Sequence, residues 1–98
     1  MDLERRDSKR SGFSFPIRYQ LKGSQRFGNT VGKDISDSGM RFISNEFFPL
    51  ATHLIFEVQH PMNRQLMRTL GEVMWVSTWP YHEKFSVGVK FLSSPMSV

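Results

Sequence analysis

Two short polar motifs hold the side chains of this sequence with the most evident binding chemistry. The first spans Arg6 to Arg10, an RxxxR pattern, with Arg5 directly before it. An arginine presents a planar fork of donors that matches a phosphate, or two adjacent acceptors such as O6 and N7 of guanine. Two or three arginines on one segment are therefore suited to clamp a phosphodiester and to hold a guanine base.

The second motif spans Asp34 to Gly39 and has the pattern DxSxxG. An ionised Asp only accepts hydrogen bonds, whereas the hydroxyl of Ser36 both donates and accepts. These groups suit the N1–H and N2–H₂ donors of guanine, which an arginine cannot bind. We expect Gly39 to permit a positive φ angle in a turn. The two motifs are complementary, but each alone is equally consistent with a solvated basic terminus or an ordinary turn.

The charge of the chain is unevenly distributed. The formal net charge of +4 belongs entirely to residues 1–26, because the remaining 72 residues hold six basic and six acidic side chains. A basic segment of this kind suits an anionic partner.

The overall composition excludes several classes of protein. A chain of 98 residues fits one domain, and the lack of cysteine excludes disulfides and thiolate metal sites. No apolar run is long enough to insert in a membrane, and the N-terminus has no signal peptide, so a cytoplasmic location is expected. No nucleophile–base pair stands out, and His53, His60 and His82 lack ligand spacing. We therefore expect no catalytic residues, no metal and no cofactor.

Alternation of apolar and polar residues predicts six strands, short connections and no convincing helix. The expected strands run over residues 13–21, 26–35, 40–43, 53–59, 65–77 and 85–91. The pattern favours an all-β antiparallel barrel or sandwich, and closure would remove exposed edges. We expect a flexible basic arm over residues 1–12, the barrel over 13–92 and a frayed tail over 93–98.

Alternation also predicts which side chains face the core. Phe27, Val31 and Ile35 should share one face of their strand, and Val73 and Trp75 should share another, with Trp75 in the core. Gly71 suggests a bulge or the close approach of another group.

Further stretches join the two motifs in one pattern. Met40–Phe42 directly follows DxSxxG, residues 71–76 read GEVMWV, and residues 88–91 read GVKF. In this order they resemble the PilZ domain, the bacterial receptor module for the second messenger cyclic di-GMP. The similarity runs from Glu4 to about Leu92. It implies a six-stranded antiparallel β-barrel that binds the nucleotide on its outer surface, with the RxxxR arm wrapped over the ligand.

The resemblance also implies roles for individual residues. Arg6 and Arg10 would contact phosphates and guanine O6 and N7. Asp34 and Ser36 would hold guanine edges and a phosphate, and Gly39 would shape the turn and leave room for the ligand.

Arg5 also belongs to the expected ligand site, and Trp75 and Arg41 are secondary candidates. An Arg at the position of Arg5 is associated in the family with an intercalated ligand dimer. Some members place an aromatic near a guanine on the strand that holds Trp75, and Arg41 would lie near the site or serve only as a surface charge. Many PilZ domains continue into a C-terminal helix, but residues 93–98 are too short for one. A partner or a second copy of the chain would then cover one end of the barrel.

These observations favour a single-domain cyclic di-GMP receptor, either a monomer or a weak homodimer, whose arm becomes ordered over the ligand. With no output domain attached, the signal would pass to a downstream protein effector. One alternative is a small basic barrel that binds single-stranded nucleic acid, which a pI of 9.9 and many aromatics would suit. It is disfavoured because the basic residues gather on the arm. A PilZ-like domain that acts only by protein–protein contacts is the other.

Overall fold

The computed structural model describes residues 14–78, 83–93 and 96–97, which excludes the segment with Arg5, Arg6 and Arg10. The described strands are β1 (Phe15–Leu21), β2 (Phe27–Ile35), β3 (Gly39–Ser44), β4 (His53–Gln59), β5 (Leu66–Thr78), β6 (Phe85–Phe91) and β7 (Met96–Ser97). The described ranges hold no helix. In particular, none of these residues belongs to a long apolar helix able to cross a membrane.

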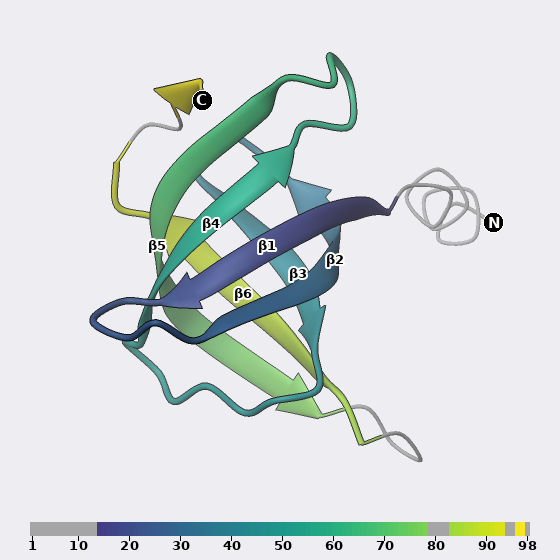
Figure 1. Cartoon of the computed structure of the whole chain (residues 1–98). Coiled ribbons are helices and arrows are strands. Elements are labelled where there is room, and N and C mark those ends of the chain that lie inside the picture. Colours follow the sequence, from purple (N-terminus) through teal and green to yellow (C-terminus); the bar gives the residue numbers. More distant parts are fainter. Residues whose placement is uncertain (1–13, 79–82, 94–95, 98) are drawn as a thin grey trace, which may run out of the picture.

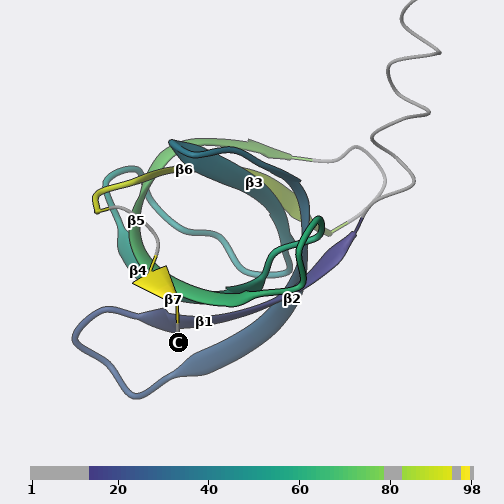
Figure 2. The same ribbon diagram turned by 90° about the horizontal axis from the view of Figure 1, so that it is seen from above.

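Strands β1 to β6 form a closed antiparallel barrel, as expected from the sequence. Their order around the wall is β4-β1-β2-β3-β6-β5, and pairing of β4 with β5 closes the ring (Figures 1 and 2). The short β7 pairs with Met67 and Arg68 of β5. Part of the tail that we expect to be frayed is therefore a two-residue strand.

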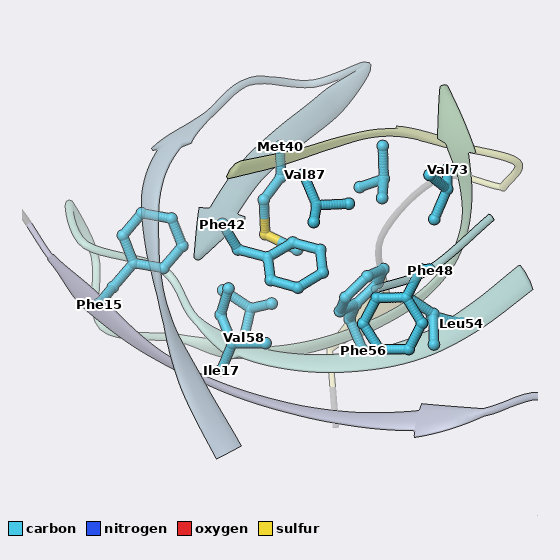
Figure 3. Packing of buried hydrophobic residues seen from close by; sticks show 11 residues of the cluster. Phe15, Ile17, Met40, Phe42, Phe48, Leu54, Phe56, Val58, Val73 and Val87 are labelled. Carbon is cyan, nitrogen blue, oxygen red and sulfur yellow. The ribbon is translucent and has the colours of Figure 1, made fainter. Parts of the chain in front are cut away.

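The core fills the barrel with aliphatic and aromatic side chains from all six strands of the wall. Leu54, Phe56 and Val58 of β4 are at most 1% exposed, as their alternation predicts. The rings of Phe42 and Phe56 meet edge to face with centroids 5.4 Å apart (Figure 3). Full burial of such a side chain stabilises the fold by about 1.5–3 kcal/mol.

One end of the barrel is covered by the connector between β3 and β4, which runs beneath the strands in Figure 1. Phe48 of this connector is 2% exposed and packs edge to face on Tyr19, with centroids 5.5 Å apart. Ala51, with a φ of 69°, donates its N–H to the carbonyl of Val73. The N–H of Val73 in turn donates to the carbonyl of Thr52. This end is therefore covered by the chain's own connector, and the prediction that a partner or a second copy covers one end of the barrel stays a prediction.

A bulge in β2 changes the face of every residue beyond it. Gly32 lies opposite Phe42 and Asp34 lies opposite Arg41, so Lys33 is an extra residue on β2. A bulge reverses alternation.

The β2 bulge explains why our prediction for this strand is wrong. Phe27 and Val31 are 55% and 40% exposed, whereas Ile35 packs against the core. The three side chains do not share a face, because Lys33 lies between Val31 and Ile35.

A second bulge lies in β5. Val73 pairs with Val89 and Trp75 pairs with Gly88, so Met74 is the extra residue. Trp75 is consequently 45% exposed, and its expected place in the core is wrong. Of the two alternatives that we expect at Gly71, the structure shows no bulge there but the close approach of another group.

The close approach to Gly71 comes from a core side chain. A Cβ on this glycine would lie 2.8 Å from Cε2 of Phe56.

Candidate functional site

Four residues on four neighbouring strands form one row across the outer face of the barrel. Asp34 of β2 lies opposite Arg41 of β3, Arg41 lies opposite Gly88 of β6, and Gly88 lies opposite Trp75 of β5. Each bulge immediately precedes one end of this row. The two extra residues thus turn both Asp34 and Trp75 outward, onto the same surface.

At one end of the row a carboxylate is held by a guanidinium. Nε of Arg41 donates to Oδ2 of Asp34 at 2.9 Å, and its Nη1 donates to Ser86 Oγ at 3.4 Å. About a third of each side chain of the ion pair is exposed, 33% for Arg41 and 36% for Asp34. A pair this exposed contributes little to stability, typically below about 1 kcal/mol. Its main effect is to fix the orientation of the carboxylate.

At the other end of the row an aromatic ring lies on a glycine. A Cβ on Gly88 would clash with Cε2 and Nε1 of Trp75, so the indole occupies the space that a side chain would take. Aromatic rings commonly cover cross-strand glycines in this way. The outward indole offers a flat apolar surface, on which a nucleobase can stack.

The loop between β2 and β3 is closed by its own serines. The Ser36 N–H donates to the Gly39 carbonyl at 2.9 Å, and the Ser38 N–H donates to Ser36 Oγ at 3.3 Å. The Phe91 N–H donates to the Ser38 carbonyl at 2.8 Å and ties the loop to β6. The Ser36 hydroxyl is thereby held at an exposed position at the end of the row.

Gly39 is required for a reason other than the one we expect. Its φ angle is not positive, and it is the first residue of β3. A Cβ at this position would clash with the backbone carbonyl of Val89 on β6. The glycine therefore permits the close approach of two strands beside the site.

These features share one open groove of about 380 Å³. Its lining includes Asp34, Ser36, Gly39, Arg41, Met74, Trp75 and Gly88. The structure thus brings Asp34, Ser36 and Gly39 of the DxSxxG motif together with the secondary candidates Arg41 and Trp75. The arginine candidates of residues 5–10 lie outside the described ranges.

Sequence reasoning missed Met74 and Gly88, among other residues that line the groove. Met74 is the bulged residue, 46% exposed, and Gly88 is the position that the indole covers. Neither has a side chain that suggests binding. The only signal was their place in the stretches GEVMWV and GVKF.

The histidines of the described chain show no sign of a metal centre. Within residues 14–78, 83–93 and 96–97, no group of three or more His, Asp and Glu side chains could hold a metal ion. His53 instead places its Nε2 3.4 Å from Oε1 of Glu72.

Known proteins resemble this chain in sequence and in fold. The family model described as PilZ domain matches residues 4–97. The structure of Bacillus subtilis Inhibitor of motility (MotI/DgrA) matches with a TM-score of 0.70 at 15% sequence identity. The match covers 84% of this chain and 39% of that protein, and at this identity it shows a shared fold. A comparison with curated protein sequences gives no match.

Proposed function

The chain belongs to the PilZ domain family, and from this membership and the groove on its outer face we propose that it is a receptor for cyclic di-GMP. PilZ domains are binding and regulatory modules. In this proposal the chain binds the dinucleotide, and a protein partner responds to the complex. The setting is the bacterial cytoplasm, where a soluble receptor would meet this second messenger.

One observation carries the proposal: Asp34 and Trp75 face the same groove from opposite ends of one row. The carboxylate of Asp34 can accept hydrogen bonds from guanine N1–H and N2–H₂. The indole of Trp75 can stack on a base, an interaction of about 1–3 kcal/mol. The hydroxyl of Ser36, at the rim, can bond a guanine edge or a phosphate.

Arg41 has two roles in the proposed complex. Two of its five N–H donors bond Asp34 and Ser86 within the described part of the chain. Arg41 also lines the groove, and its remaining donors suit a phosphate oxygen or guanine O6. Arg41 would therefore orient the carboxylate of Asp34 and also reduce the repulsion between that carboxylate and a dianionic ligand.

The arginine motif completes the proposed site. Arg6 and Arg10 would bind the phosphates and guanine O6 and N7, with the arm lying over the ligand. Arg5 would enlarge the site to hold an intercalated pair of ligands. Each charge-assisted hydrogen bond would contribute about 1.5–3 kcal/mol.

Titration calorimetry with cyclic di-GMP tests this proposal, with GMP and a single-stranded oligonucleotide as comparison ligands. We expect saturable heat with cyclic di-GMP, and a loss of about 1.5–3 kcal/mol in Asp34→Ala and in Arg6→Ala. Lys84→Ala, which removes an exposed charge away from the groove, is the control and should bind as the parent does. Heat with the oligonucleotide but none with cyclic di-GMP would contradict the proposal and favour nucleic-acid binding.

The ligand ratio in the same titration tests the role of Arg5. We expect two cyclic di-GMP molecules per chain for the parent and one for Arg5→Ala. A ratio of one for both proteins would remove Arg5 from the site.

A further inference from the structure

A second hollow, of about 210 Å³, lies on the opposite wall of the barrel. It is lined by Arg18, Gln20, Phe27, Ile55, Glu57 and Arg68, among others, and shares no residue with the ligand groove. These residues belong to β2, β1, β4 and β5, whereas the groove lies over β2, β3, β6 and β5. In a closed ring of six strands, the two surfaces therefore face away from each other.

The charges in this hollow are arranged in a row. Arg18 of β1 lies opposite Glu57 of β4, and Glu57 lies opposite Arg68 of β5. Among the described residues, neither arginine forms an ion pair with Glu57 or with another carboxylate. Both guanidiniums are exposed at the surface without an acidic partner from this part of the chain, and the row carries an excess of one positive charge.

An exposed aromatic ring lies beside this row. Phe27, which precedes the β2 bulge and lies opposite Gln20 of β1, is 55% exposed on the outer face, and the guanidinium of Arg18 stacks 4.3 Å from its ring centroid. Arginine and aromatic side chains are the residue types most enriched where proteins meet and where truncation weakens binding. The hollow thus combines an apolar contact with two arginines.

We propose that this surface docks a segment of a partner protein in which two carboxylates flank an apolar side chain. The carboxylates would pair with Arg18 and Arg68, and the apolar side chain would pack on Phe27 and Ile55. The two arginines are two strand spacings apart, about 10 Å, which sets the separation of the carboxylates. Glu57, in the middle of the row, disfavours a polyphosphate chain and so favours a protein over a nucleic acid.

Two strands serve both surfaces. β2 places Phe27 in the docking surface and Asp34 in the ligand groove, and β5 places Arg68 in the first and Trp75 in the second. The inference rests on the proposed function only in that the chain acts through a protein partner. Docking itself does not need the nucleotide, so the two proposals can fail separately.

Amide chemical shifts of the ¹⁵N-labelled full chain test the docking surface. The probe is an acetylated peptide in which glutamates alternate with leucine and phenylalanine. One comparison probe has lysine in place of each glutamate, and the other is a single-stranded oligothymidylate. We expect saturable shifts around Arg18 and Glu57 with the acidic peptide alone. The double variant Arg18→Ala, Arg68→Ala should bind it roughly tenfold or more weakly, as the loss of a charge-assisted hydrogen bond predicts.

Two controls separate this result from misfolding and from failure of the ligand site. Lys84→Ala should bind the acidic peptide as the parent does, and the double variant should retain the parent's affinity for cyclic di-GMP. Absence of a saturable shift, equal binding of the lysine peptide, or unchanged binding in the double variant would overturn the docking surface. Saturable shifts with oligothymidylate at these amides would replace it with a nucleic-acid surface.

Discussion

The indole of Trp75 lies against the backbone of Gly88, in the space where a Cβ atom would otherwise stand. The same relation recurs twice in the barrel, with Tyr19 over Gly28 and Phe15 over Gly32, each directly opposed in register. An aromatic ring thus replaces the side chain that the neighbouring strand lacks. In the case of Trp75, the ring is on the outer face.

Replacing Gly88 by Ala should displace the indole and weaken the binding of cyclic di-GMP. We expect a loss of about 1–3 kcal/mol, the energy of one base–aromatic contact. The measurement is a calorimetric double-mutant cycle with Trp75→Ala. In the Trp75→Ala background, Gly88→Ala should have almost no further effect, and an additive result would show that Gly88 does not act through the indole.

Replacing Gly39 by Ala should destabilise the fold even without ligand. The obstructing atom is the backbone carbonyl of Val89, so β3 and β6 must separate to admit the methyl group. Forced overpacking of this kind costs about 1–3 kcal/mol or more, which urea unfolding measures. Asp37→Ala, an exposed change in the same loop, should stay within about 0.5 kcal/mol of the parent. Equal stability of the two variants would refute the close approach.

Phe48 and Phe47 form a matched pair of neighbours on the connector that covers the barrel end. Phe48 is 2% exposed and Phe47 is 57% exposed. Phe48→Ala should lower the free energy of unfolding by about 3–5 kcal/mol. Phe47→Ala, which loses an edge contact with Phe85, should lower it by about 1 kcal/mol or less. Chemical denaturation measures the free energy of unfolding of both variants. Similar losses of stability in the two would mean that Phe48 does not fill the barrel end.

Tyr19 makes stability depend on pH in the alkaline range. Burial raises the pKa of Tyr19 above its usual 10.0, and the Glu46 carboxylate, whose Oε1 accepts a hydrogen bond from the Tyr19 hydroxyl at 3.3 Å, raises it further. A raised pKa means that the folded state favours the neutral phenol. This contribution is complete below pH 10 and is lost as the pH rises through the folded-state value.

The alkaline contribution is measured as a difference between two proteins. Urea unfolding of the parent and of Tyr19→Phe from about pH 8 to about pH 11 cancels the titration of other groups. We expect the stability advantage of the parent to shrink above pH 10, the usual pKa of tyrosine. A constant difference across the range would mean that Tyr19 titrates as it does in the unfolded chain.

Strand positions could be predicted from the sequence because alternation is clear in β4 and β6. Leu54, Phe56 and Val58 are buried as their spacing indicates. The same rule failed in β2 and β5, because a bulge is a matter of pairing between strands and leaves no mark in residue type. Nothing in the residue types of Lys33 and Met74 indicates a bulge, yet each reverses the faces of the residues that follow it in its strand.

The candidate site was predicted in part. Asp34, Ser36 and Gly39 were named from their types, their spacing and the resemblance to the PilZ domain, and the structure places all three in one groove, while their part in ligand binding stays a prediction. The role of Gly39 was misjudged, because its constraint comes from Val89, fifty residues away in the chain. The fit of Phe48 into the barrel end was also beyond prediction, since an aromatic in an irregular connector has no periodicity to indicate its direction.

The bulge at Met74 makes the outward position of Trp75 depend on how β5 pairs with β6. If the two strands paired without the extra residue, regular alternation from Val73 would turn the indole toward Val87 and the core, where the barrel is already full. If Met74 itself were deleted, the tryptophan would directly follow Val73 and would still face outward, opposite Gly88. The outward aromatic position would therefore survive loss of the bulged residue, but not a slip in register that removes the bulge and keeps the residue.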